Sequence, residues 1–160
     1  METRLEILNE KKVIGKRITT SITDNKTFDL WKSFMQLRKQ IVNVITTDLY
    51  DVQTFDDDYW TNFNPQNTFE KWAAMEVANF DHVPDKMETL TIPPGLYIVF
   101  THKGLPSEGA KTFEYIFGTW LPNSNYELDN RPHFGKMTDK YNNTDPASEE
   151  DLWIPVRIKP

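Results

Sequence analysis

The sequence contains no cysteine, few glycines and no long apolar segment, and each shortage excludes a class of protein. Without cysteine among its 160 residues, the chain forms no disulfide and offers no thiolate to a metal. Its best apolar run, Leu90 to Thr101, contains two prolines and a glycine and is shorter than the roughly 20 apolar residues of a membrane-spanning helix. Met1 to Glu10 is charged, unlike a secretory signal. We therefore expect a cytoplasmic protein without a membrane segment.

Basic residues are also scarce. Lys and Arg number 18 against 24 Asp and Glu, which gives a net charge of −6. Affinity for nucleic acid comes mainly from clustered Lys and Arg, and the only such clusters are Lys11–Arg17 and Lys32–Lys39. We interpret both as solvated surface and expect no direct contact with nucleic acid.

The sequence also lacks the common catalytic and metal-binding motifs. The six glycines are scattered, so the chain has no phosphate loop, dinucleotide fingerprint or nucleophile elbow. The three histidines, His82, His102 and His133, do not have the spacing of a metal site. The sequence therefore predicts no metal, no cofactor and no catalytic residue that a motif identifies.

Aromatic residues, by contrast, are abundant. Phe, Trp and Tyr make up 13% of the chain, with five Trp, although the hydrophobic share is only 38%. Part of this excess must form an ordinary core, because aromatic side chains carry much of the burial energy of a small domain. We hypothesise that the remainder lines a ligand site.

The chain contains an internal similarity at an interval of about 80 residues. Lys12–Gly15, followed by the β-rich Lys16–Ile22, is similar to Ile92–Gly95, followed by Leu96–Thr101. Each segment predicts a strand that begins at a glycine. The sequence thus indicates two related halves, approximately 1–82 and 83–160, within a single domain that spans 1–160.

A helical pattern follows each of these strands. In the second half the apolar residues at helical spacing are Phe113, Ile116, Phe117, Trp120 and Leu121, and Pro122 ends the pattern. In the first half a similar stripe runs from Leu30 to Leu37. We expect both stripes to pack against a core rather than to form a cofactor site.

Two further strands are predicted after each helix. They are Leu49–Phe55 and Trp72–Phe80 in the first half, and Tyr126–Met137, interrupted near Pro132, and Leu152–Ile158 in the second. Each half then has the order strand, helix, strand, strand. This order predicts an α+β fold of two β-α-β-β modules, with antiparallel sheets and the helices on one side.

The last strands of the two halves also align, and their alternation separates two faces. Ala73–Val77 aligns with Leu152–Val156, so Met75 and Ile154 occupy equivalent positions. We expect both side chains to contact the helices. The opposite face carries Trp72, Ala74, Glu76 and Ala78 in one half and Trp153 and Pro155 in the other.

Two long segments are rich in polar turn residues. Asp56–Thr68 contains the acidic triplet Asp56–Asp58 but lacks the ligand spacing and glycine of a calcium loop. Asp139–Asp151 is composed largely of Asn, Asp, Pro and Ser. We interpret both as exposed loops.

Several segments together give the sequence a resemblance to a known family. They are Leu30–Phe34, Met75–Val77, Ile92–Gly104, Trp120–Leu128, Arg131–Phe134 and Trp153–Val156. In this order and spacing they resemble the GyrI-like, AraC-type effector-binding family, in particular its stand-alone members among integron-cassette proteins. The resemblance runs nearly from end to end.

The resemblance implies two β-α-β-β modules related by a pseudo-twofold axis, with a cleft between them that binds lipophilic and often cationic compounds. The sequence shows no helix-turn-helix, so we expect contact with a promoter only through a partner chain or a different surface. One position departs from the family. Where relatives carry Phe-Glu-x-Tyr, this chain reads Phe134-Gly135-Lys136-Met137, so a pocket carboxylate and a tyrosine are both missing.

These expectations define a candidate ligand site. Its residues are Tyr50, Trp72, Glu76, Phe100, Trp120, Phe134 and Trp153. Glu76 is the acid of greatest interest, because a partly buried carboxylate must meet a cation, a hydrogen-bond donor or a proton. It either forms a structural salt bridge or reads the charge of a ligand with help from cation–π contacts.

Three functions stay open at this point. The first is a binding protein for a small lipophilic, possibly cationic molecule. The second is a hydrolase of a lipophilic electrophile with Glu76 as general base. The third, suggested by some relatives, is an interaction module that regulates a topoisomerase or a transcription factor.

Overall fold

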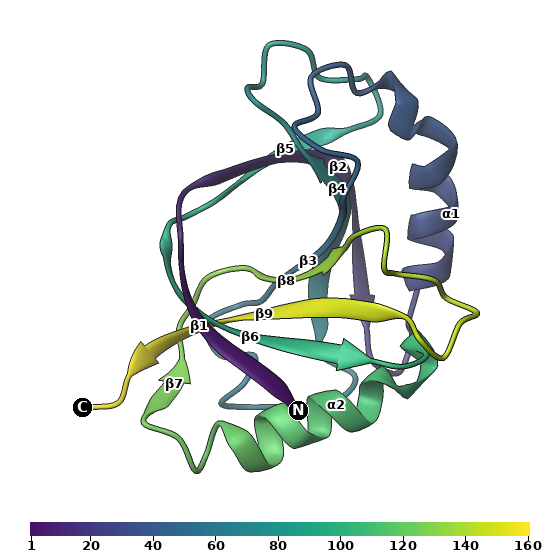
Figure 1. Ribbon diagram of the computed structural model, residues 1–160. Coiled ribbons are helices and arrows are strands. Elements are labelled where there is room, and N and C mark those ends of the chain that lie inside the picture. The colour runs from purple at the N-terminus through teal and green to yellow at the C-terminus, as the bar shows by residue number, and fades with distance from the viewer.

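The computed structural model describes residues 1–160 as a curved sheet with two helices on its outside (Figure 1). The strands are β1 (Glu2–Leu8), β2 (Lys11–Ser21), β3 (Leu49–Thr54), β4 (Thr68–Glu76), β5 (Glu88–Ile92), β6 (Gly95–Lys103), β7 (Tyr126–Leu128), β8 (His133–Met137) and β9 (Glu149–Ile158). The helices are α1 (Thr27–Leu37) and α2 (Gly109–Tyr115), extended by the short turns η1 (Arg38–Gln40), η2 (Pro106–Glu108) and η3 (Ile116–Trp120). None of the helices combines the length and apolarity needed to cross a membrane.

The sheet has the strand order β1-β6-β9-β8-β3-β4-β2-β5, with β7 added on β9. Its two ends are joined because β1 runs almost directly into β2 and β5 into β6. The pairs Leu8–Gly95 and Lys11–Ile92 lie in one antiparallel register on either side of a two-residue break. The sheet therefore curls back on itself and encloses an inner face, as the ring of strands in Figure 1 shows.

The predicted order of strand, helix, strand, strand is present in both halves. It is β2-α1-β3-β4 in the first and β6-α2-β8-β9 in the second, and the halves meet where β3 pairs with β8. The break predicted near Pro132 separates β7 from β8. The α+β class and the antiparallel pairing are confirmed, whereas the duplication and its twofold axis stay predictions.

Glycine begins only one of the two predicted strands. Gly95 is the first residue of β6, but Gly15 lies inside β2, opposite Ala74 of β4. A Cβ at position 15 would collide with the backbone oxygen of Ala73. Gly15 is thus required for the close approach of two strands, and the prediction that it opens a strand was wrong.

Strand alternation divides the core into three clusters. Met75 and Val77 pack beneath α1 with Leu30 and Phe34. The corresponding cluster beneath α2 contains Ile98, Phe100, Ile116, Leu121, Leu152, Ile154 and Val156. The third cluster fills the inner face, with Tyr50, Trp72, Tyr97 and Phe134 among its members. The expectation that Met75 and Ile154 meet the helices is confirmed.

Candidate functional site

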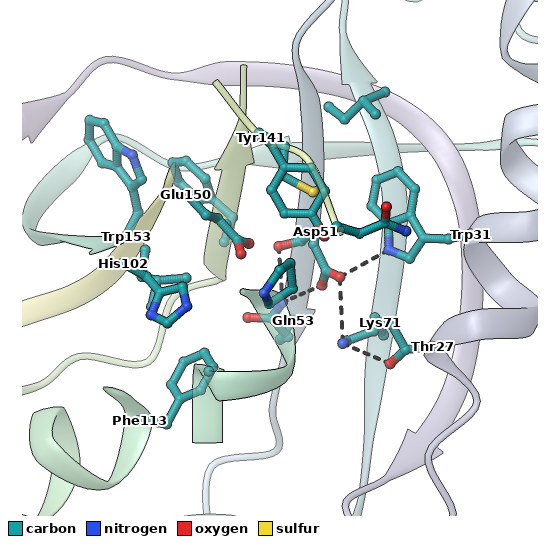
Figure 2. Close-up of a pocket in the computed structure, with 18 of the residues that line it drawn as sticks. Thr27, Trp31, Asp51, Gln53, Lys71, His102, Phe113, Tyr141, Glu150 and Trp153 are labelled. Atoms are coloured by element: carbon teal, nitrogen blue, oxygen red, sulfur yellow. Dashed lines mark hydrogen bonds and ion pairs between the residues drawn. The ribbon is translucent and has the colours of Figure 1, made fainter. Parts of the chain in front are cut away.

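A groove of about 590 Å³ lies on the outer face of the sheet, between α1 and α2 (Figure 2). Its floor is formed by the central strands β3, β8 and β9, and the loop before β9 covers part of it. Its aromatic lining residues are Trp31, Phe113, Phe134, Tyr141 and Trp153. Its charged and titratable lining residues are Asp51, Lys71, His102, Tyr141 and Glu150.

Asp51 of β3 is held by a closed set of partners on the α1 side of the groove. The indole Nε1 of Trp31 donates to Asp51 Oδ2 at 3.0 Å, and Lys71 Nζ lies 3.5 Å from the same oxygen. Gln53 donates to the other carboxylate oxygen. Lys71 also donates to Thr27 Oγ1 at 2.9 Å. The Asp51 charge is therefore balanced within the protein, as the dashed lines of Figure 2 show.

Glu150 of β9 enters the groove without such partners. Its carboxylate lies directly over Gly135, where a Cβ would collide with Oε1. No hydrogen bond or ion pair reaches it, and none is drawn to it in Figure 2. Burial is the main reason that its pKa rises to about 7, with a further rise from the negative Asp51 and an opposing effect of Lys71.

Tyr141 brings a second polar group to the same space from the loop before β9. Burial, together with the charges of Glu150 and Asp51, raises the pKa of its phenol to about 12. The hydroxyl is therefore a neutral donor at physiological pH. Glu150 and Tyr141 together supply an acid and a phenol in the groove, beside Gly135 and Met137, the two positions where the resemblance leads us to expect an acid and a tyrosine.

His102 of β6 lies opposite Glu150 in the β6–β9 register, but it is engaged elsewhere. Its Nδ1 lies 2.7 Å from Thr112 Oγ1 and its Nε2 lies 3.0 Å from the carbonyl oxygen of Leu105. Both ring nitrogens are thus used to fix the start of α2. His102 lines the groove but makes no ion pair with Glu150.

The structure brings only two of the seven predicted site residues to this groove, Phe134 and Trp153. Their rings, however, stack on each other at a centroid distance of 5.2 Å and pack with the inner cluster. Tyr50 and Trp72 lie on the inner face, 1% and 5% exposed, within the packed cluster. The predicted cleft face is therefore largely the enclosed inner face of the sheet.

Phe100 and Trp120 lie apart from the other five. Phe100 is fully buried beneath α2, and Trp120 packs edge-on against it at 5.1 Å. Because Phe100 pairs directly with Leu152, and cross-strand partners share a face, its side chain points to the helix and not to the inner cluster. Phe100 and Trp120 form core contacts of the second half.

Glu76 has a partner inside the protein. Lys11 Nζ donates to Glu76 Oε1 at 2.9 Å, and the Tyr50 hydroxyl lies 3.5 Å from the same oxygen. Lys11 also lies over the Tyr50 ring. Of the two alternatives, this geometry favours the structural salt bridge, and it removes the support for Glu76 as a general base.

A second hollow, of about 650 Å³, borders the loop after β3. This loop was expected to be solvated, which is wrong for Tyr59 and Trp60. Tyr59 is 3% exposed, and Trp60 stacks on Phe117 at 4.8 Å and faces His133 at 5.8 Å. Burial lowers the pKa of His133 to about 3. The loop therefore packs against the α2 side of the sheet through an aromatic cluster that contains Trp60, Phe117 and a neutral His133.

Sequence reasoning missed Asp51, Tyr141 and Glu150. Tyr141 and Glu150 belong to a segment whose composition is that of an exposed turn. Gly135 was the one available signal, because a missing side chain on β8 leaves space that a residue of the neighbouring strand can fill.

Comparison with known proteins identifies relatives for nearly the whole chain. Residues 4–156 match the family described as "Integron-associated effector binding protein". Over 93 residues, or 58% of this chain, the sequence is 31% identical to the transcriptional regulator BrlR of Pseudomonas aeruginosa. That match covers 34% of BrlR, so this chain corresponds to only about a third of the regulator.

Solved structures with the same fold cover the chain from end to end. SAV2435 bound to tetraphenylphosphonium has a TM-score of 0.78 at 16% identity and covers 98% of this chain and 94% of its own. The integron cassette protein VCH_CASS2 of Vibrio cholerae has a TM-score of 0.70 at 14% identity, over 97% of this chain and 95% of its own. At these sequence identities the similarity shows a shared fold alone.

Proposed function

Because this chain belongs to the family of integron-associated effector-binding proteins, we propose that it is a small-molecule receptor whose lipophilic ligand lies in the groove between α1 and α2. One observation carries this proposal. The groove is a hollow of about 590 Å³ with aromatic walls and an unpartnered polar group in its floor. Pockets for drug-sized ligands have about 300–1,000 Å³, a mostly apolar lining and a few convergent polar groups.

The walls suit a flat or polyaromatic molecule. Trp31 approaches from α1 and Phe113 from α2. A ligand ring between such side chains gains area burial and stacking, and a cationic ligand also gains cation–π attraction. SAV2435, which shares the fold, was solved with the lipophilic cation tetraphenylphosphonium. This supports the same ligand class here.

The proposed role is sensing or sequestering the ligand without direct contact with DNA. The net charge of −6 opposes binding to phosphate groups. The relative BrlR is a transcriptional regulator of which this chain matches one third. We propose that residues 1–160 supply an effector-binding function, so that any effect on transcription passes through a separate DNA-binding unit.

Fluorescence titration tests the proposal. Tetraphenylphosphonium and the neutral triphenylphosphine oxide would be added to the protein while Trp emission is followed. We expect saturable quenching at one site. Trp31→Ala should weaken binding about 5- to 30-fold, because loss of one aromatic wall removes on the order of 1–2 kcal/mol.

Phe28→Ala is the matched control, since Phe28 is an aromatic residue of the same helix but is 76% exposed and does not line the groove. It should leave the affinity unchanged. The assignment of the groove would be refuted if neither compound gave saturable quenching. It would also be refuted if Trp31→Ala and Phe28→Ala lost the same amount of affinity.

A further inference from the structure

We infer that the groove binds a lipophilic cation in exchange for a proton, and that Glu150 is the group that exchanges it. In the empty groove the Glu150 carboxyl holds a proton, and an arriving monovalent organic cation takes its place while the proton leaves to solvent. This inference rests on the proposed function and specifies its ligand class and its dependence on pH.

The position of Glu150 is the first support. The side chain rises from β9 into the groove and lies over Gly135 of β8. The missing side chain of Gly135 leaves the space that the carboxylate fills, because a Cβ at this position would collide with Glu150 Oε1. The carboxylate therefore occupies the floor of the groove, between the aromatic walls that would hold an apolar ligand.

The neighbouring strands offer no cation that could neutralise it. Lys71 of β4, the only basic residue that lines the groove, lies 3.5 Å from Asp51 Oδ2 and donates to Thr27. On β6, both ring nitrogens of His102 bond to Thr112 and Leu105. Lys71 and His102 are thus committed to other groups.

The remaining charges near Glu150 do not compensate it either. Lys136 of β8 lies 3.8 Å from Asp48. Asp151, the next residue of β9, bonds to Thr101 and Arg4 on the other face of the sheet. From α1 and α2 only uncharged side chains line the groove, and the loop before β9 adds the neutral phenol of Tyr141. The cation that balances the Glu150 carboxylate must therefore come from a ligand. In the ligand-free groove the carboxyl is neutralised by a bound proton.

The proton affinity of the site agrees with this geometry. Burial first, and then the charge of Asp51, raise the pKa of Glu150 to about 7. A cation bound beside Glu150 attracts the ionised carboxylate and therefore lowers the pKa of the carboxyl. Binding must then release protons, and affinity for a cation must fall as the solution becomes acidic.

Isothermal titration calorimetry with tetraphenylphosphonium measures the exchange directly, because this cation does not titrate. For a pKa near 7 in the free protein and well below 6 in the complex, the dissociation constant should be about tenfold larger at pH 6 than at pH 8. Titration at pH 7 in buffers of different ionisation enthalpy should show about half a proton released per ligand. Triphenylphosphine oxide should not bind more weakly at pH 6.

Glu150→Gln should abolish both the pH dependence and the proton release. Glu149→Gln is the matched control, because Glu149 is the preceding residue on β9, does not line the groove and should leave both unchanged. If Glu150→Gln fails to fold, the number of protons released when the unmodified protein binds the cation still tests the exchange.

The outcomes separate the two proposals. If neither compound binds at any pH, the proposed function fails and the exchange fails with it. Saturable binding of the cation with no proton released and one affinity from pH 6 to pH 8 would overturn the exchange alone. A pH dependence that survives in Glu150→Gln would overturn the assignment to Glu150.

Discussion

The two faces of the sheet are both rich in aromatic residues, but they differ in how they are filled. On the inner face Tyr50, Tyr97 and Phe134 are at most 2% exposed and pack ring against ring. On the outer face the aromatic side chains of Trp31 and Phe113 border a hollow. The content of aromatic residues therefore does not distinguish a core from a ligand site.

The carboxylates of the two faces make the distinction. On the inner face Glu76 is paired with Lys11, and the hydroxyl of Tyr97 donates to the carbonyl of Pro132 at 2.8 Å. In the groove Glu150 has neither a cation nor a donor. A half-buried carboxylate without a partner is costly, so its presence favours the groove as the face on which a ligand completes the structure.

The largest expected effect comes from truncating the inner face. Trp72→Ala should lower the free energy of unfolding by about 3–5 kcal/mol, the usual cost of a large cavity in a packed core. Trp31→Ala on the groove should cost clearly less, since it opens onto an existing hollow. Urea denaturation of the two variants measures this, and equal losses would contradict the difference between the faces.

The sequence was sufficient to predict the order of elements and the division of β4 and β9 into two faces. Both depend on local patterns, namely apolar spacing along α1 and α2 and alternation within a strand. The strands β1 and β5 were not predicted. Their side chains are mostly exposed, and their pairing partners, β6 and β2, lie far away in the sequence.

The candidate site was harder to predict, because it depends on register between strands. Phe100 was assigned to the cleft, but its pairing with Leu152 turns it toward α2. Glu150 and Tyr141 were hidden in a segment with the composition of an exposed turn. Their approach to Gly135 follows from the pairing of β8 with β9, in which Gly135 lies opposite Leu152, and composition carries no information on that pairing.

Two glycine substitutions compare the rigidity of the faces. A Cβ at position 15 would meet the backbone of Ala73 and Ala74, which cannot move without separating β2 from β4. Gly15→Ala should therefore cost about 1–3 kcal/mol or more in the free energy of unfolding. A Cβ at position 135 would meet the end of the flexible Glu150 side chain. Gly135→Ala should cost less than about 1 kcal/mol.

The measurement is again denaturation, combined with ligand titration. Although Gly135→Ala should fold, it should weaken binding of tetraphenylphosphonium, because the displaced carboxylate moves into the groove. Unchanged affinity in a folded Gly135→Ala variant would argue that the ligand does not reach the floor over β8.

Glu150→Gln should change stability in a pH-dependent manner. The folded-state pKa of Glu150, about 7, lies above its ordinary value of 4.5, so its contribution to stability is fully present below pH 4.5 and is lost as the pH rises through 7. Relative to the unmodified protein, Glu150→Gln should be more stable by about 1–2 kcal/mol at pH 8, a value reduced for partial solvent access. At pH 4 the two should be equal. Denaturation at both pH values measures the difference, and a constant offset would contradict it.

Glu76→Gln has the smallest expected effect and tests the inner face as the source of charge recognition. The substitution removes the ion pair with Lys11 but keeps an oxygen that can accept its hydrogen bond, so the cost should be about 1 kcal/mol. Because Glu76 lies outside the groove, the ratio of the affinities for tetraphenylphosphonium and triphenylphosphine oxide should not change, whereas Glu150→Gln should shift it toward the neutral compound at pH 8. A Glu76→Gln variant that loses the cation selectively would return charge recognition to the inner face, since the two carboxylates lie on opposite sides of the same sheet and one ligand cannot contact both.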